Sequence, residues 1–365
     1  MIRVAKHGNT SIRVTKLIAI FTLLLIFLAL FNSSEIWESF KRSLPIIASF
    51  WVLLGMSSFK NNFNHSIVVN RQIFYSLTLF TTNVLIISVL SLGDQFMEKS
   101  IGITYSASFL RGGWFTIFSL HWAAIITSLI PFFIESKFNK NFGKTVWIIL
   151  FFAASFILIF AYKRIYYIIL FTGILNYIIY RFSNNRRKLL SYIAFYFIAI
   201  SFIFVSYFIF LEYLEIRNKT LSFEEFQNEG RYMEFALYPE VVSERNLLFF
   251  LFGDELFVSG GKFEALDQIE IGRFLHNDFA HLLYGAGIVG VSIYLLIFWN
   301  IYSEGKQLLS EYRTQKHRFF YFLINTIIIT SIISGFSDGI LILINRVIPF
   351  YLIGVSLGFM KSKIT

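Results

Sequence analysis

Apolar runs long enough to form membrane-spanning helices recur from one end of the chain to the other, separated by shorter polar segments. A helix needs about 20 mostly apolar residues to cross a bilayer. Runs of this kind, without the alternation of barrel strands, predict an all-α polytopic membrane protein with about ten transmembrane helices. The expected spans are Leu17–Phe31, Leu44–Phe59, Ile73–Leu92, Trp114–Ile134, Val146–Tyr162, Ile165–Tyr180, Leu189–Leu211, Phe279–Tyr302, Phe319–Phe336 and Val347–Met360.

The first span follows a polar, basic leader, Met1–Lys16. A basic leader and a short apolar core are also the pattern of a cleaved signal peptide. The end of the run, Leu30-Phe31-Asn32, lacks the small residues of a cleavage site. We therefore expect a retained signal anchor.

Lysine and arginine are concentrated in alternate connecting segments. If the N-terminus lies inside, the inner segments carry most of these residues and the short outer loops few, as the positive-inside rule requires. This topology predicts a single membrane domain, 1–365, with both termini in the cytoplasm. It places a large, strongly acidic segment, 212–275, outside, between the seventh and eighth spans.

The outer segment carries signals of short helices. Ser222 and Glu225 form a capping box, and apolar residues then recur at helical spacing. The pattern predicts an amphipathic helix over about Phe223–Tyr238 that stops at Pro239. A second apolar patch, Leu247–Leu251, is closed by Phe252-Gly253-Asp254.

Composition agrees with the membrane interpretation. Of the 365 residues, 56% are hydrophobic and 15% charged, whereas soluble domains have about 25% charged residues. The chain has no cysteine, which excludes disulfides, thiol nucleophiles and cysteine metal sites. The net charge of +10 is explained by anchoring at the cytoplasmic face, so we expect no nucleic-acid partner.

Charged residues at membrane depth are costly and mark candidate functional sites. Lys163 and Arg164 separate two spans with almost no loop. They either snorkel toward lipid headgroups or form a cation pair that holds an anionic substrate. Arg231 lies in the middle of the expected outer helix, where it is either a solvated residue or part of the site.

A second group of polar residues, Arg273, His276 and Asp278, lies where the chain re-enters the membrane before the eighth span. His276 is the natural candidate for a general base, because the unperturbed pKa of histidine lies near neutrality. The alternative is an interfacial histidine that only hydrogen-bonds a neighbour. His281, inside the span, is expected to be structural.

Metal and nucleotide sites have no sequence support. There is no His-x-x-x-His pair and no phosphate-binding loop, so we expect no cofactor, no metal and no direct use of ATP.

The segment that begins with His276-Asn277-Asp278-Phe279 and continues to Gly290 resembles the His-Asn motif region of the O-antigen polymerase and O-antigen ligase superfamily. Gly230-Arg231 and Phe252-Gly253 are similar to two motifs of that family's large periplasmic loop. Arg164 resembles the arginine of its Ser-Arg-Gly motif, although serine and glycine are both missing here. The resemblance covers roughly 146–296.

The resemblance implies a GT-C-like glycosyltransferase of the bacterial inner membrane with its active site on the periplasmic side. Such an enzyme polymerises undecaprenyl-diphosphate-linked repeat units into O-antigen or a related surface polysaccharide without a metal. Its partners would be the lipid-linked donor and acceptor, the lipid bilayer and a chain-length regulator protein.

The roles that follow from the resemblance are electrostatic and acid–base. Arg231 and Arg164, with Lys163 and Arg273, would bind the diphosphate and stabilise it as the leaving group. His276 would deprotonate or orient the acceptor hydroxyl. Asn277 and Asp278 would orient His276 or contact the substrate.

Three other functions stay open. A ligase of the same superfamily would transfer the finished glycan to lipid A core. A lipid-linked oligosaccharide flippase or other transporter would carry charges along a central pathway, whereas the charges here gather at one face. An assembly protein would use the acidic outer segment to bind a partner.

Overall fold

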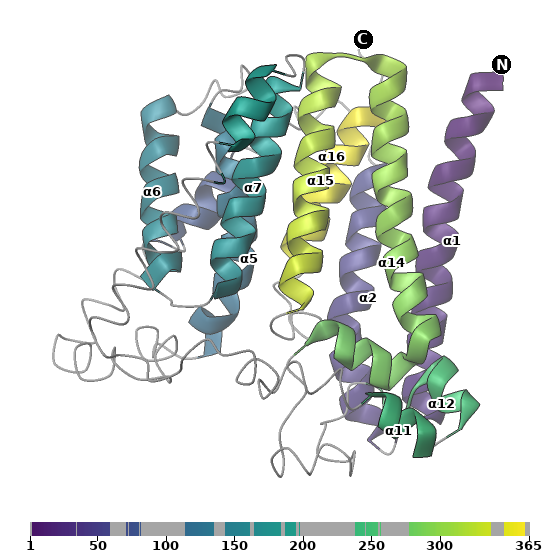
Figure 1. The fold of residues 1–365 in the computed structure, drawn as a ribbon. Coiled ribbons are helices and arrows are strands. Elements are labelled where there is room, and N and C mark those ends of the chain that lie inside the picture. Colours follow the sequence, from purple (N-terminus) through teal and green to yellow (C-terminus); the bar gives the residue numbers. More distant parts are fainter. Residues whose placement is uncertain are drawn as a thin grey trace, which may run out of the picture. The chain divides into compact units, whose positions relative to one another are not determined.

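We describe the chain from a computed structural model (Figure 1). The residues that it describes are 2–33, 35–58, 73–79, 114–134, 143–160, 164–183, 187–194, 238–244, 246–254, 277–336 and 347–361, with single residues at 71, 81, 197 and 256.

The chain divides into two compact units. The first combines Met1–Asn61, Ser222–His317 and Ser331–Thr365, and the second combines Asn62–Leu221 and Arg318–Thr330. Helix α15, Gln315–Gly335, therefore contributes its middle to the second unit and both of its ends to the first.

Every regular element in the described part of the chain is a helix. Four described helices are long and apolar enough to cross a membrane, which is consistent with a membrane protein: Ile12–Phe31, Ile165–Phe182, Asp278–Tyr312 and Gln315–Gly335. Shorter apolar helices cover Ala123–Ile134, Lys144–Phe156 and Val347–Lys361.

Helix bounds agree closely with the apolar runs. The fourth predicted span is α5, Trp114–Ile134, and the fifth and sixth are α6, Lys144–Phe160, and α7, Arg164–Phe182. The tenth predicted span is α16, Val347–Lys361. The third and seventh predicted spans lie largely outside the described residues.

Several described helices are longer than their apolar runs, α1 and α14 by the largest margins. Helix α1, Ile2–Phe31, includes most of the basic leader. Helix α14, Asp278–Tyr312, continues beyond Tyr302 into a polar segment. Its C-cap Arg313 adopts a left-handed conformation, and Thr314 then caps α15. A hydropathy pattern detects only the apolar part of a helix, so it does not predict polar extensions of this kind.

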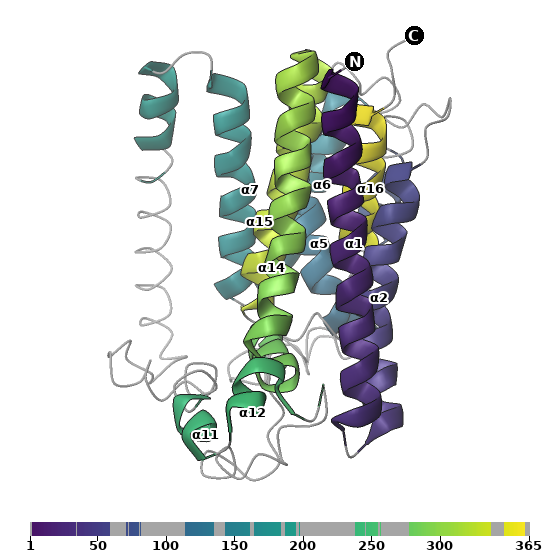
Figure 2. The same ribbon diagram turned by 90° about the vertical axis from the view of Figure 1, so that its right-hand side faces the viewer.

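The first unit is a bundle of α1, α2 (Ile36–Ser58), α14 and α16. Helix α2 packs most extensively on α16, and α1 packs on both α14 and α2 (Figure 2). Gly354 of α16 permits the close contact between α2 and α16, because a Cβ there would lie 2.6 Å from the Leu53 carbonyl oxygen. Small residues allow membrane helices to approach this closely.

Aromatic rings fill the centre of this bundle. The Phe50 ring contacts Phe21, Tyr294 and Phe350 in edge-on geometry, with centroids 5.8, 6.0 and 4.9 Å apart. These four rings come from α1, α2, α14 and α16, and all four are buried. Edge-to-face pairs add to the stabilisation from burial alone.

The ends of α14, α15 and α16 are joined by polar contacts. Lys361 Nζ lies 2.8 Å from Glu304 Oε1, and the Glu304 carboxylate is buried. His317 Nε2 lies 3.1 Å from the Met360 carbonyl oxygen. These contacts fasten the C-terminal turn of α16 to the rest of the unit.

In the second unit, α5 packs on both α6 and α7. Gly173 of α7 lies against Ser128 of α5. A Cβ added to Gly173 would lie only 2.4 Å from the Cβ of Ser128. Phe133 stacks on Trp147 at 5.4 Å and connects α5 to α6.

Two short helices belong to the outer segment of the chain. Helix α11 covers Tyr238–Glu244, and α12 covers Leu247–Phe252. Pro239 lies in the first turn of α11, a position that tolerates proline, and the expectation that the preceding helical pattern stops there stays a prediction. The predicted helix over Phe223–Tyr238 otherwise lies outside the described residues.

Candidate functional site

Of the seven residues assigned to the site from sequence, two are described with their side chains, Asn277 and Asp278. They lie together at the head of α14, in the first unit. Arg164 is the first residue of α7, in the second unit, and its side chain lies outside the described part. Lys163, Arg231, Arg273 and His276 also lie outside the described residues.

Asn277 is the N-cap of α14. Its Oδ1 accepts hydrogen bonds from the backbone N–H groups of Phe279, at 2.8 Å, and Ala280, at 3.3 Å. Asparagine is among the residues preferred at this position, because it satisfies amides that a helix start leaves without partners. Its Nδ2 donates to the Phe336 carbonyl at 3.0 Å. One side chain therefore starts α14 and ties it to the residue that follows α15.

Asp278 begins the helix directly after this cap. Both Asn277 and Asp278 are only 1% exposed. A carboxylate in the first turn interacts favourably with the positive end of the helix dipole. A Cβ added to Gly335 would lie 3.5 Å from Asp278 Oδ2. The head of α14 therefore places a buried carboxylate, two residues after His276 in sequence, beside the end of α15.

Helix α14 is broken at Gly287. This residue has φ 61° and ψ −169° inside an otherwise helical stretch, a region open almost only to glycine. Figure 1 shows the first part of α14 running at an angle to the long part that follows. His281, which lies in the first part, is buried. The bend thus separates a short buried helix at the head of α14 from the long apolar part of the same helix.

The turn after α12 packs against this break. Gly253 has φ 70° and ψ −166°, nearly the same glycine-only conformation. A Cβ on Gly253 would lie 2.4 Å from the Tyr284 carbonyl oxygen, and one on Gly287 would lie 2.4 Å from the Leu251 carbonyl oxygen. The two glycines therefore let two backbone segments touch.

A hydrogen bond accompanies the contact. The N–H of Asp254 donates to the Tyr284 carbonyl at 2.8 Å. In an unbroken helix that carbonyl would accept from the amide four residues later, beyond Gly287. Unpaired backbone groups are costly in a membrane protein. The turn after α12 thus supplies a donor where the bend in α14 removes one.

Asn32 joins the first span to the same turn. Its Nδ2 donates to the Gly253 carbonyl at 2.7 Å. The sequence interpretation used Asn32 only to argue against signal cleavage. The signal that could have drawn attention to it is a carboxamide placed directly after an apolar run, at the level where a span leaves the membrane.

Tyr238 of α11 covers the outer side of this junction. Its ring meets that of Tyr284 edge-on at 5.1 Å and lies 6.2 Å from that of Phe249 in α12. Burial raises the pKa of the Tyr238 phenol above its usual value, because the charged form is disfavoured away from water. The ring therefore stays neutral at physiological pH and acts as an apolar cover.

A cavity of about 610 Å³ opens between α1 and α12. Its apolar wall comes from the last turns of α1 and the exposed face of α12, and its rim carries three polar side chains. The lining residues are Leu24, Phe27, Leu28, Phe31, Asn32, Asn246, Leu248, Phe249, Phe252, Gly253 and Asp254.

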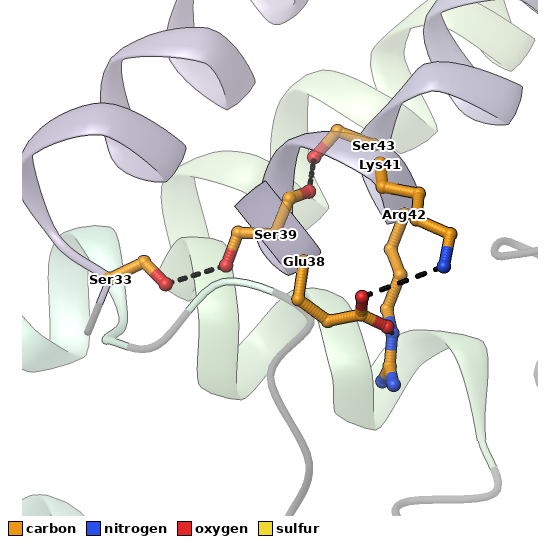
Figure 3. Close-up of polar contacts among 6 residues, drawn as sticks. All are labelled: Ser33, Glu38, Ser39, Lys41, Arg42 and Ser43. Atoms are coloured by element: carbon orange, nitrogen blue, oxygen red, sulfur yellow. Dashed lines mark hydrogen bonds and ion pairs between the residues drawn. The ribbon is translucent and has the colours of Figure 1, made fainter. Parts of the chain in front are cut away.

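A polar cluster lies beside it at the start of α2 (Figure 3). The Ser33 and Ser39 hydroxyls lie 2.6 Å apart, and the Ser43 hydroxyl donates to the Ser39 carbonyl at 2.7 Å. The first of these contacts spans the short turn between α1 and α2, and the second lies within α2.

Charged groups in the same cluster form a small network. Arg42 Nε donates to Glu38 Oε1 at 2.7 Å, and Lys41 Nζ lies 3.7 Å from Glu38 Oε2 (Figure 3). The hydrogen bond from Arg42 lowers the pKa of the Glu38 carboxyl.

Chemically, the described part of the site offers a capped helix start, a buried carboxylate and a neighbouring cavity. Among the described residues, no three histidine, cysteine, aspartate or glutamate side chains are grouped to hold a metal ion. The prediction of metal-independent chemistry stays a prediction.

A scan of protein-family models finds no family that matches the chain, and a search of curated proteins finds no matching relative.

Proposed function

We propose that the chain is a polytopic glycosyltransferase that polymerises undecaprenyl-diphosphate-linked oligosaccharide repeat units into O-antigen or a related surface polysaccharide. In this proposal the chain crosses the bacterial inner membrane about ten times with a GT-C-like arrangement. Both termini are cytoplasmic, and the reaction takes place on the periplasmic side.

The observation that carries the proposal is the contact between the backbone segments that contain Gly253 and Gly287. These residues belong to two segments, Phe252-Gly253 and His276–Gly290, that resemble separate motifs of the polymerase and ligase superfamily. The two segments touch through their backbones in the first unit. A motif resemblance by chance gives no reason for such a contact between segments distant in sequence.

The head of α14 supports a reacting group at this place. His276 is followed in sequence by a buried cap and a buried carboxylate, Asn277 and Asp278. Buried polar residues at the end of a membrane helix are expensive and are therefore functional candidates. Of the groups assigned from sequence, His276 is the only histidine, the residue type whose unperturbed pKa lies near neutrality and which most often serves as a general base.

The proposed reaction is a single displacement. The acceptor hydroxyl oxygen forms a bond to the anomeric carbon of the donor chain, and the bond from that carbon to the diphosphate oxygen breaks. His276 takes the hydroxyl proton. The cationic groups of Arg231, Arg164, Lys163 and Arg273 stabilise the diphosphate as it leaves on its lipid. The donor is already activated, so no nucleotide is consumed.

The test is incubation of the purified protein with lipid-linked repeat units, without added nucleotide or metal. We expect lipid-linked products longer than one repeat. His276→Ala and Arg231→Ala should each lower product formation by at least about 100-fold, the scale of a lost general base or charge stabiliser.

Matched controls are available on α1. His7→Ala and Arg13→Ala remove the same residue types from the N-terminal half of α1, which the proposed site does not include, and should keep normal activity. Full-length polymer from both His276→Ala and Arg231→Ala would contradict the site assignment. If Lys163→Ala and Arg164→Ala retain full activity while His276→Ala and Arg231→Ala lose it, Lys163 and Arg164 do not belong to the site.

A cell-based measurement separates polymerase from ligase. In cells that lack a polymerase, lipopolysaccharide carries a single repeat unit on the core. In cells that lack a ligase, the core carries no O-antigen at all. If cells that lack this protein carry no O-antigen on the core, the proposed polymerase function is wrong and a ligase function takes its place.

A further inference from the structure

Helix α12 exposes an almost wholly apolar surface. Leu247 is 71% exposed, Leu248 64%, Phe252 38% and Phe250 36%, whereas Phe249 is buried against the rest of the unit. The helix has no charged residue between Leu247 and Phe252. Exposed apolar side chains gathered on one short element mark an interaction surface.

The depth of α12 follows from the cavity that it shares with α1 and from the bond between Asn32 and Gly253. The candidate span Ile12–Phe31 has 20 residues and is therefore about 30 Å long, the thickness of the hydrocarbon layer. The cavity between the two helices is lined on α1 from Leu24 to Asn32. This distance corresponds to about 12 Å of helix rise. Helix α12 thus stands beside the last third of the span rather than beyond its end.

The exposed surface of α12 also continues that of α1. Leu23, Phe27, Leu30 and Phe31 of α1 are exposed to the outside of the bundle, Phe31 by 74% and Leu23 by 66%. In a spanning helix such side chains face lipid. Since Phe27 and Phe31 line the same cavity as Leu248 and Phe252, the lipid-facing surface of α1 runs into that of α12 without a break.

Helix α12 is held in this position from both sides. Asn32 donates to the carbonyl of Gly253, and the N–H of Asp254 donates to the carbonyl of Tyr284. Its own start is capped by Asn246, whose Oδ1 accepts from Phe249 N at 3.0 Å. The apolar side chains therefore cannot turn inward without breaking these bonds.

We infer that α12 is inserted into the membrane leaflet at the Phe31 end of α1. Phospholipid acyl chains cover Leu247, Leu248, Phe250 and Phe252 and fill the cavity of about 610 Å³. The charge of the cavity fits this occupant: the lining residues include one carboxylate, Asp254, and no basic residue. A phosphate-bearing headgroup would need cationic partners there.

The inference is independent of the proposed reaction, because it concerns only membrane contact. Insertion of an apolar helix at the interface requires apolar side chains and an anchored position, and both are present on α12. It makes the outer segment of the chain a part of the membrane domain at this point.

Because the chain has no cysteine, a single nitroxide label can be placed without background. Leu247→Cys and Leu248→Cys would be labelled in the full-length protein and reconstituted into vesicles of phosphatidylethanolamine and phosphatidylglycerol. Collision with oxygen, which concentrates in hydrocarbon, would be compared with collision with a water-soluble nickel chelate. Leu23→Cys on α1 is the hydrocarbon control, and Ser243→Cys, exposed on α11, is the aqueous control.

We expect both α12 labels to collide more often with oxygen than with the nickel chelate, as Leu23→Cys does and Ser243→Cys does not. Preferential collision with the nickel chelate at both positions would overturn the inference, since α12 would then face water. Low collision with both reagents would overturn it as well, because protein rather than lipid would cover the helix.

Discussion

Gly253 and Gly287 each lie against the backbone that directly precedes the other glycine, and each has a conformation that almost only glycine adopts. Gly253 is the C-cap of α12, and Gly287 breaks α14. At each position a Cβ would collide with the backbone of the other segment. The contact joins the outer segment of the chain to the head of a membrane-spanning helix. Its stability therefore decides whether the proposed site is assembled.

Alanine at Gly287 should destabilise the protein strongly. Adopting the glycine-only conformation costs about 1–3 kcal/mol, and the Cβ would collide with the backbone of Leu251 at 2.4 Å. Gly253→Ala should behave alike, because its Cβ would meet the Tyr284 carbonyl oxygen. Thermal unfolding of the detergent-purified variants measures the loss. Gly55→Ala is the control: a Cβ there meets nothing within 4 Å, so this variant should be neutral or slightly more stable.

The two ends of the Asn277 carboxamide can be separated by substitution. Asn277→Ala removes the cap of α14 and the bond to Phe336, and should cost about 1–2 kcal/mol for the cap alone. Asn277→Ser keeps a capping oxygen and loses the Nδ2 donor to the Phe336 carbonyl without adding a buried charge, so its loss should be smaller. Thermal unfolding of the two variants compares them. Equal losses would mean that the cap contributes nothing.

The ion pair between Glu304 and Lys361 should respond asymmetrically to mutation. The Glu304 side chain is 4% exposed and that of Lys361 20%. Lys361→Ala leaves a buried carboxylate without this partner, for which losses of about 3–5 kcal/mol are typical. Glu304→Ala leaves an ammonium that can reach water and should cost less. The free energies of unfolding of both single variants and the double variant give the comparison, and the opposite order would contradict the burial argument.

Acid should remove the contribution of Glu38 to stability. The folded-state pKa of this carboxyl is lowered by Arg42, so its contribution is fully present above the unfolded pKa. It is lost as the pH falls through the lowered folded pKa. The pair lies near the surface, so the effect is on the order of a few tenths of a kcal/mol. Melting curves of the unmodified protein and Glu38→Gln should differ at pH 7 and converge in strong acid.

Much of the helical fold could be predicted from the sequence, because apolar runs report the depth of each segment in the membrane. Helix α5, Trp114–Ile134, was predicted to the residue. Helix α12 was anticipated as an apolar patch closed by Phe252-Gly253-Asp254. In both places local composition and local structure carry the same information.

The junction at Gly287 could not be predicted in this way. The segment from Leu282 to Gly290 has the composition of an ordinary membrane helix, and glycine is frequent in such helices without breaking them. The break exists because a distant turn supplies a hydrogen-bond donor and a closely fitting backbone. Such a long-range cause leaves no periodic signal in the local sequence.

The candidate site was predicted in part. The placement of Asn277 and Asp278 at the start of the eighth predicted span is confirmed. Their assignment to a substrate site, and those of His276, Arg231, Arg273, Lys163 and Arg164, stay predictions. Asn32 was missed because its partner, Gly253, is far away in the sequence and the bond is invisible in either neighbourhood alone.

The bond between Asn32 and Gly253 also dictates an order of biogenesis. Asn32 leaves the ribosome 221 residues before its acceptor, a delay on the order of tens of seconds at ordinary rates of translation. During that interval the first helix sits in the membrane without this contact. In the proposed topology, the turn after α12 must cross the bilayer before the contact can close, so translocation of the outer segment becomes a checkpoint for completing the first unit.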